Sequence, residues 1–469
     1  MRVMAAVLAI VLVGAAPPPQ RPSAPDAKLR AIIAPVSAAE LKKTVATLVG
    51  FGTRHTLSSQ TDPKRGIGAA LQWAEGRFKS FGLETVRPCD IFKGERVPQP
   101  TRICDAVAIQ RGTERPNDVV IIQGHIDSRV SDVMNFTSDA PGANDDGSGT
   151  AAVIEAARVL SKHKFPSTIV YATLSGEEQG LYGGKVLAAY AKAQGWNVVT
   201  VLNNDIIGNS CSSDGLCDST HARVLSEGPR SQGEADLSRS VHSLGGENDS
   251  PSRNISRYLD SLADRLRIGL DVRQIWRTDR FGRGGDHIPF LEMGYPAARI
   301  SVAVENYNWQ HQDLRTENGI RYGDTIDNVD FAYLAKMTKL NVAALAAIAS
   351  APPPPAEPRV VGAVSTDTRL LWTDAPGAAA YRIVWRRTDE ANWSNSLLQP
   401  GTSPAACRKA GVTITPPCVD GHVLRHIRVD DWVFGVSSVS KDGFESPVAS
   451  AVPGGEFKPY VAPPPKPNP

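Results

Sequence analysis

The chain of 469 residues has no marked excess of charge of either sign. Its 51 basic and 49 acidic residues give a formal net charge of +2, and neither sign forms a long block. Proteins that bind nucleic acid or an acidic membrane surface usually carry a basic patch or stripe. The composition therefore predicts no nucleic-acid partner and no attachment to an acidic membrane by charge.

Long apolar runs are also missing beyond the N-terminus. A helix that crosses a bilayer needs about 20 apolar residues, and no stretch after residues 1–16 approaches that length. Residues 1–16 combine an early arginine, a short apolar stretch and small residues at the end, which is typical of a signal peptide. The alternative is a lone N-terminal anchor, but three prolines at 17–19 end the apolar run early. We therefore predict a periplasmic or secreted protein that is not an integral membrane protein.

Cysteine is scarce, and no two cysteines have the C-x-x-C spacing of a thiolate zinc site. The six cysteines fall into three local couples, which are Cys89 with Cys104, Cys211 with Cys217, and Cys407 with Cys418. Other connectivities are possible, as are buried free thiols, but local pairing is the simplest arrangement. In an exported chain the couples favour disulfides over metal thiolates.

The chain does contain a regular alternation of strand-like and helix-like segments. Predicted strands cover 118–123, 168–174, 198–202 and 298–302, and predicted helices cover 37–49, 66–81, 148–163, 180–194, 255–266 and 329–349. At the first helix, Ser37 and Glu40 form a capping-box pattern. Alternation of this kind gives a mixed, largely parallel sheet flanked by helices. We predict an α/β catalytic domain over residues 37–350, preceded by a proline-containing segment at 17–36.

The composition changes after the proline-rich linker at 351–358, which is typical of a semi-rigid polyproline spacer. Between 359 and 455, short alternating apolar runs are separated by turn residues, as in a small all-β sandwich. Trp372, Tyr381 and the closing segment 439–447 make this part resemble a fibronectin type III module. The resemblance implies contact with a cell surface or a polymer, or a spacer role. A proline-rich tail at 456–469 ends the chain.

Three polar motifs follow predicted strands or begin predicted helices. They are Gly124-His125-Ile126-Asp127, the run 142–150 around Asp145, and the run 175–181 with Glu177 and Glu178. Open α/β sheets gather their ligands at the carboxyl ends of the strands, so these groups could meet at one edge. His125 and Asp127 lie two residues apart, which puts them on the same side of a strand. A carboxylate there can hold the imidazole tautomer that leaves the other nitrogen for a metal.

Each motif alone has an ordinary structural explanation, such as a core salt bridge for the histidine or helix capping for the acids. Asp205 at another strand end and His311 in the segment 307–313 complete a set of two histidines and three carboxylates. Nitrogen and oxygen donors in this mix suit zinc, with cobalt or manganese as substitutes. A carboxylate that bridges two metals is a recurrent device in hydrolases. The combined set therefore predicts a hydrolase with two metal ions.

The order of these motifs resembles the co-catalytic zinc aminopeptidases and their relatives, which include bacterial leucyl aminopeptidases, glutamate carboxypeptidase II and glutaminyl cyclases. The resemblance covers roughly residues 39–350. It implies two Zn²⁺ per chain and a cis peptide bond after Asp145. It also implies roles for seven residues: His125 and Asp205 hold one ion, Glu178 and His311 hold the other, Asp145 bridges them, Glu177 is the general base, and Asp127 orients His125.

One position departs from the family pattern. His311 is followed by Gln312, where many relatives have threonine. The rival ligand is His287, but its segment, 284–290, resembles a family motif that shapes the pocket beside the metals. We therefore favour His311.

The resemblance implies an exported metallo-aminopeptidase that acts on peptides or proteins with free N-termini. A glutaminyl cyclase, which would retain one zinc ion, and a carboxypeptidase are alternatives on the same fold. An alternative of a different class is an adhesion or binding protein with an inert α/β domain. Retention of all five candidate ligands argues against an inert domain, because folding alone does not require five such groups at strand ends.

Overall fold

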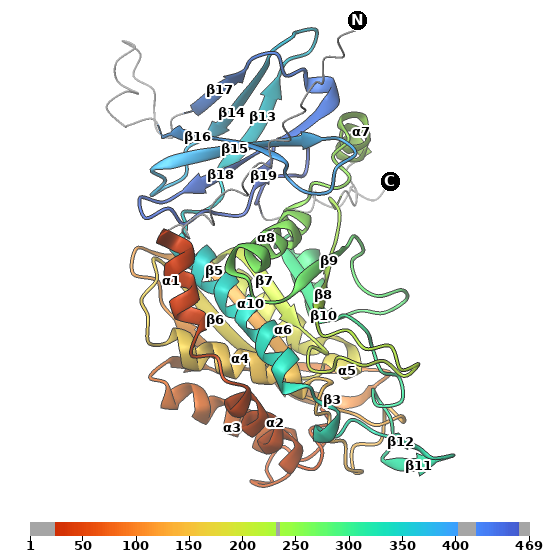
Figure 1. Cartoon of the computed structure of the whole chain (residues 1–469). Helices are drawn as coiled ribbons and strands as arrows, with labels where there is room; N and C mark the ends of the chain where they lie inside the picture. Colours follow the sequence, from red (N-terminus) through yellow and green to blue (C-terminus); the bar gives the residue numbers. More distant parts are fainter. Residues whose placement is uncertain (1–23, 231–234, 402–418, 459–469) are drawn as a thin grey trace, which may run out of the picture.

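The computed structural model describes residues 24–230, 235–401 and 419–458 (Figure 1). Its main feature is an eight-stranded sheet with the order β1-β4-β6-β5-β7-β10-β8-β9. The run β6-β5-β7-β10 is parallel, as is the pair β8-β9. The junctions β1-β4, β4-β6 and β10-β8 are antiparallel. The predicted mixed, largely parallel sheet is therefore confirmed. Its strands are β1 (Glu84–Val86), β4 (Ala106–Gln110), β5 (Arg115–His125), β6 (Ser167–Leu174), β7 (Asn197–Asn204), β8 (His221–Ser226), β9 (Asp271–Ile275) and β10 (Ala297–Val302).

The central strands form because their residues are apolar on both faces. In β5, Val120 and Ile122 join the core on one face of the sheet, and Val119 and Ile121 join the core on the other. A parallel strand that is covered on both sides has such a continuous apolar run. The four strands predicted from apolar runs are β5, β6, β7 and β10, each longer than predicted, and β5 extends furthest, with 11 residues from Arg115 to His125.

Helices cover both faces of the sheet. The larger core contains residues of six helices, which are α1 (Ala24–Ile33), α2 (Ala38–Gly50), α3 (Ile67–Ser80), α4 (Gly147–Leu160), α8 (Pro251–Leu266) and α10 (Phe331–Ser350). The smaller core contains residues of α6 (Tyr182–Ala193) and α9 (Ile288–Glu292). The remaining elements of this domain are α5 (Glu177–Gly180), α7 (Ala235–Leu244), the 3-10 helix η1 (Ile326–Asn328), and the hairpins β2 (Cys89–Gly94) with β3 (Val97–Cys104) and β11 (Arg315–Glu317) with β12 (Ile320–Tyr322).

Three helices differ from expectation for local reasons. The Ser37 side chain caps α2 by accepting from the Glu40 N–H at 3.4 Å, but the Ser37 N–H donates to Glu155 Oε1 at 2.8 Å. Only half of the predicted capping box therefore forms. The helix predicted at 180–194 is broken at Leu181, whose φ of 58° separates α5 from α6. Finally, α1 lies within the segment 17–36, where no element was predicted.

Among the described residues, α10 is the one helix long and apolar enough to span a membrane by length and composition. In its apolar 18-residue window, 78% is buried inside the protein. The helix contacts α4, α8 and β5. Its apolar character therefore reflects its place in the core.

The C-terminal part is a separate all-β unit at the top of Figure 1. Its two antiparallel sheets have the orders β13-β14-β17 and β16-β15-β18-β19. The sheets share a core in which the rings of Trp372 and Tyr381 lie 5.2 Å apart. The small all-β sandwich is confirmed, whereas likeness to a fibronectin type III module stays a prediction. The elements are β13 (Ala356–Val361), β14 (Thr368–Thr373), β15 (Ala380–Arg387), β16 (Asn395–Pro400), β17 (Val419–Leu424), η2 (Val429–Asp431), β18 (Trp432–Val439) and β19 (Ala449–Ser450).

Two of the three predicted disulfides are present. Cys89–Cys104 joins β2 to β3, and Cys211–Cys217 closes a short loop after β7. The third couple, Cys407 with Cys418, lies outside the described residues, as do the predicted signal peptide and residues 459–469 of the tail.

Candidate metal centre

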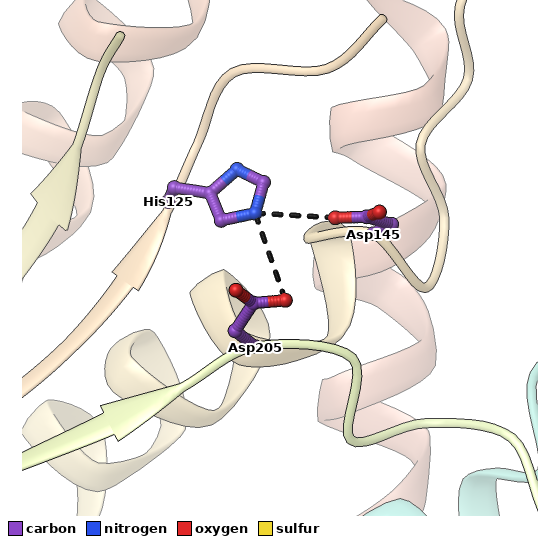
Figure 2. A group of neighbouring side chains, drawn as sticks. All are labelled: His125, Asp145 and Asp205. Atoms are coloured by element: carbon purple, nitrogen blue, oxygen red, sulfur yellow. Dashed lines mark ion pairs between the residues drawn. The ribbon is translucent and has the colours of Figure 1, made fainter. Parts of the chain in front are cut away.

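Three predicted ligands meet at the carboxyl edge of the central strands. His125 ends β5, Asp205 follows the neighbouring β7, and Asp145 lies just before α4. His125 Nε2 is 3.1 Å from Asp145 Oδ1 and 3.9 Å from Asp205 Oδ1 (Figure 2). All three residues are buried, and one ligand atom from each lies within 4.8 Å of the others. This group could hold a metal ion.

A second group lies beside the first and shares Asp145 with it. His311 Nε2 is 2.9 Å from Asp145 Oδ2 and 3.0 Å from Glu178 Oε1. Glu178 belongs to α5, directly after β6, so adjacent parallel strands deliver both groups to one edge. A third set of atoms with this spacing, from His125, Glu177 and Glu178, overlaps the first two. The structure thus brings together all five predicted ligands, with the Glu177 carboxylate beside them.

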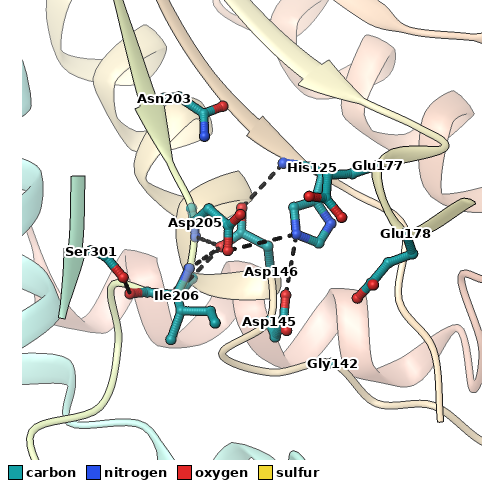
Figure 3. Close-up of polar contacts among 12 residues, drawn as sticks. His125, Gly142, Asp145, Asp146, Glu177, Glu178, Asn203, Asp205, Ile206 and Ser301 are labelled. Atoms are coloured by element: carbon teal, nitrogen blue, oxygen red, sulfur yellow. Dashed lines mark hydrogen bonds and ion pairs between the residues drawn. The ribbon is translucent and has the colours of Figure 1, made fainter. Parts of the chain in front are cut away.

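Asp146 and Asp324 hold the loop that carries Asp145. The Asp146 carboxylate accepts from the N–H groups of His125 at 3.1 Å, Gly149 at 2.9 Å and Ile206 at 3.1 Å (Figure 3). Asp324 accepts from the Asp145 N–H at 2.7 Å. The Asp145–Asp146 peptide bond is cis, as the family resemblance implied. The loop is therefore fixed to β5, α4 and the segment after β7.

Asp127 lies between His125 and the start of α5. Its backbone carbonyl oxygen is 3.2 Å from His125 Nδ1, and its carboxylate Oδ1 is 3.5 Å from the same nitrogen. The carboxylate also accepts from the Thr56 hydroxyl at 3.0 Å and from the backbone N–H groups of Glu177 at 3.3 Å and Glu178 at 3.2 Å. A single residue can therefore orient the imidazole and position both glutamates.

The adjacent glutamates have different electrostatic environments. Burial raises the pKa of Glu177 well above its ordinary value, and Glu178 adds to this effect while His125 opposes it. Burial alone would also raise the pKa of Glu178, but His311 and Arg129 lower it to about 2. Glu178 therefore stays ionised, as a metal ligand must, while Glu177 can hold a proton.

Arg129 contacts both members of the second group. Its Nε donates to Glu178 Oε2 at 2.8 Å, and its Nη2 lies 2.6 Å from His311 Nδ1. A guanidinium has only donors, so the second contact requires an unprotonated Nδ1 and places the His311 proton on Nε2. A metal bound to Nε2 would therefore require this proton to leave and Arg129 to shift away from Nδ1.

His287, the rival to His311, lies elsewhere. It is fully buried, with Nε2 2.7 Å from the Thr278 carbonyl oxygen and 3.7 Å from Asp279 Oδ2. It belongs to none of the three groups found among the described residues. The geometry thus brings His311, and not His287, to the other candidate ligands.

The charged groups that surround the candidate ligands were not predicted from the sequence. These are Arg129 beside Glu178, Arg299 at 2.8 Å from Asp205 Oδ1, and Asp324 beneath Asp145. Arg129 follows the motif at 124–127 by two residues, and its nearness to that motif was the available signal. No local pattern marks Arg299 or Asp324.

Residues 106–344 match the model of peptidase family M28. A protein from Leptosphaeria maculans named a probable zinc metalloprotease is 41% identical over 445 residues, covering 92% of this chain and 98% of its own. Another of that name, from Pyricularia oryzae, is 38% identical over 461 residues, covering 93% and 88%.

Solved structures with a similar fold include two proteins of Legionella pneumophila. The LapA aminopeptidase is 20% identical with a TM-score of 0.48 and covers 69% of this chain and 75% of its own. LapB is 19% identical with a TM-score of 0.49 and covers 68% and 74%. The family match and the long alignments with curated relatives show that the chain belongs to peptidase family M28.

Proposed function

We propose that this protein is an exported zinc aminopeptidase that hydrolyses the peptide bond after a free N-terminal residue. Membership of a peptidase family and relatives named zinc metalloproteases support zinc-dependent peptide hydrolysis. The observation that carries the proposal is the pair of adjacent ligand groups that share Asp145, with Glu177 beside them. The disulfides fit an oxidising compartment, in agreement with the predicted signal peptide.

The donor set fits zinc. Asp145 Oδ2 and Glu178 Oε1 are buried and both face His311 Nε2, whose single proton can be donated to only one of them, so that one oxygen is left without a donor. Buried carboxylate oxygens without a donor are costly unless a cation satisfies them. His125 and Asp205 would hold one ion, Glu178 and His311 the other, and Asp145 both. When bound, the two ions supply Lewis-acid chemistry, which polarises the scissile carbonyl and lowers the pKa of water.

Glu177 is placed to move the proton. It would take a proton from the attacking water as the new C–O bond forms, and return it to the leaving amine as the C–N bond breaks. Its raised pKa suits both steps, because the carboxyl can hold the proton between them. The free α-amino group of the substrate would bind against the carboxylates of the pocket, which would favour cleavage at the N-terminus.

The test combines metal content with substrate pairs that differ only at the amine. We expect the purified protein to hold two zinc ions and to cleave alanyl, leucyl or glutamyl p-nitroanilides but not their N-acetyl forms. Chelation should abolish this activity, and zinc should restore it. Cleavage of the N-acetyl forms alone would contradict the proposed aminopeptidase activity and would indicate a different hydrolase. One zinc ion with cyclisation of N-terminal glutamine would instead identify a glutaminyl cyclase.

Glu177→Gln tests the proton-transfer role. We expect kcat to fall by about 10²–10⁴-fold, the usual contribution of a general base, while zinc content stays at the wild-type value. Glu114→Gln is a matched control, because Glu114 is exposed and directly precedes β5, at the end of the strand opposite His125. Wild-type kcat in the Glu177 variant would exclude this residue as the base.

A further inference from the structure

The pocket over the candidate metal centre carries an unusual number of arginines. It has a volume of about 460 Å³, and its lining includes Arg96, Arg129, Arg280 and Arg283 beside the candidate ligands. Among the described residues that line it, Leu181 supplies the one large apolar side chain. Phe281, close in sequence to the lining residues Arg280 and Gly282, is 89% exposed and outside this lining. The pocket is therefore poorly suited to a large apolar side chain.

Two acids beside the pocket, Glu305 and Asp279, are outnumbered by the arginines that they contact. The Glu305 carboxylate is shared by Arg223 at 2.6 Å, Arg280 at 3.4 Å and Arg283 at 2.8 Å. Asp279 is shared by Arg280 at 3.0 Å and Arg299 at 3.2 Å. Because these two acids each serve more than one guanidinium, they do not neutralise all the arginines that they contact, whereas the four acids of the pocket lining lie at the candidate metal centre.

Two of the lining arginines, Arg96 and Arg283, each form a contact through only one of their guanidinium nitrogens. Arg283 is 32% exposed and forms its ion pair through Nη1 alone. Arg96 donates from Nη1 to the Glu178 carbonyl oxygen at 3.0 Å, and it takes part in none of the ion pairs found among the described residues. A guanidinium has five N–H donors in a planar fork that matches a carboxylate. Arg280, in contrast, is only 9% exposed and is held by two acids.

Arg96 is held in place by the hairpin that carries it. It lies in the turn between β2 and β3, whose far ends are joined by the Cys89–Cys104 disulfide. On the same hairpin, Phe92 stacks on Tyr182 of α6 with ring centroids 4.3 Å apart. The hairpin is thus tied to the domain at its base and along its length, which positions Arg96 before substrate binds.

We propose that Arg96 and Arg283 select peptide substrates that carry a carboxylate close to the scissile bond. This inference rests on the proposed aminopeptidase function and adds a substrate class to it. The carboxylate could be the acidic side chain of the N-terminal residue or the C-terminal carboxylate of a dipeptide. Both sources present the same planar anion to the arginines.

Two substrate pairs separate these sources. Glutamyl and glutaminyl p-nitroanilide differ only in the side-chain charge, and Ala-Ala and Ala-Ala amide differ only in the terminal charge. We expect kcat/KM to favour the anion by roughly tenfold or more in at least one pair, the scale of a charge-assisted hydrogen bond. Preference in the first pair identifies the side chain as the source, and preference in the second identifies the C-terminus.

Variants connect this preference to the arginines. Arg283→Gln and Arg96→Gln should each reduce the anion-to-neutral ratio by at least severalfold, whereas Arg102→Gln, on the same hairpin but outside the pocket lining, should not. Calorimetric binding of free glutamate and glutamine to wild type and Arg283→Gln gives a second readout that does not need turnover.

Ready cleavage of neutral substrates, with equal rates in both pairs and no effect of either variant, would overturn the inference about the arginines and leave the proposed function intact. Failure to cleave any free-amine substrate would remove the proposed function and the inference with it.

Discussion

Asp145 is the residue on which both groups of candidate ligands depend. Its Oδ1 faces His125, and its Oδ2 faces His311. Asp145→Asn should therefore lower the zinc content by up to two ions per chain, whereas Asp205→Asn should affect one. Elemental analysis after dialysis against micromolar zinc would measure this, with the exposed Asp132→Asn as control. Equal loss in the two site variants would contradict a shared carboxylate.

At the same scale, residues were predictable where their role follows from local sequence. His125 ends a buried strand, Asp205 and the two glutamates follow buried strands, and Asp145 precedes a helix, so the topology alone gathers them at one edge. The groups that support them were not predictable, because their partners are distant in the chain. Asp324 is 179 residues from Asp145, and Arg299 is 94 residues from Asp205. Only folding shows which charges meet.

Among the elements, the β2–β3 hairpin is the one that most affects the pocket rim. Replacing Cys89 and Cys104 with serine removes the covalent tie at its base. We expect the hairpin amides to exchange hydrogen faster, while β5 and β6 keep their protection because they are buried on both faces. The free energy of unfolding should fall by about 2–4 kcal/mol. Hydrogen-exchange mass spectrometry and urea denaturation would measure the two effects.

The second disulfide provides the matched comparison for this experiment. Cys211–Cys217 closes a loop with a sequence separation of 6, against 15 for Cys89–Cys104. Loss of the shorter closure should destabilise the protein less, and should leave exchange in the hairpin unchanged. Unchanged hairpin exchange in the Cys89/Cys104 variant would show that packing of Phe92 on Tyr182 is sufficient to hold the element.

Elements were predictable when a long apolar run or a helical period defined them. The parallel centre of the sheet was found because doubly buried strands have continuous apolar sequences. The outer strands β1, β4, β8 and β9 were not predicted, and neither were the hairpins. Several of these segments are short or partly exposed, as in the case of β1, so their sequences carry weak patterns. Tertiary contacts also override local ones, as when Glu155 replaces Glu40 at the Ser37 N–H.

On the scale of the whole molecule, the all-β unit is joined to the α/β domain by buried charges. Asp249, just before α8, forms an ion pair at 2.7 Å with Arg386 of β15, and both side chains are at most 1% exposed. Asp249 also accepts from the Ser450 hydroxyl at 3.1 Å. Arg257 of α8 donates to the Ala391 carbonyl oxygen at 2.6 Å and lies 5.7 Å from the Trp393 ring. A flexible tether would not have such a contact.

The contact between the two units is linked to the candidate metal centre through the helix α8 and the strand β10. The helix α8 packs on β8, β9 and β10. On β10, Arg299 forms the ion pair with Asp205 at 2.8 Å. The all-β unit therefore packs, through α8, on the strand that carries Arg299, and we expect the two units to unfold together.

Substitutions in the buried ion pair test this coupling. Breaking a buried pair from one side leaves an uncompensated charge and costs about 3–5 kcal/mol, so Asp249→Leu and Arg386→Leu should each destabilise the protein by that order. The double variant should lose less than the sum of the two, because it leaves neither charge of this pair unpartnered. Arg387→Leu is the control, because the ion pair of Arg387 with Asp389 is exposed, and it should change stability by less than about 1 kcal/mol.

Urea unfolding followed by tryptophan fluorescence and circular dichroism should show one transition. Two separate transitions in the wild type would mean that the units fold independently, and strictly additive effects in the double variant would mean that the Asp249–Arg386 pair does not stabilise the contact between them.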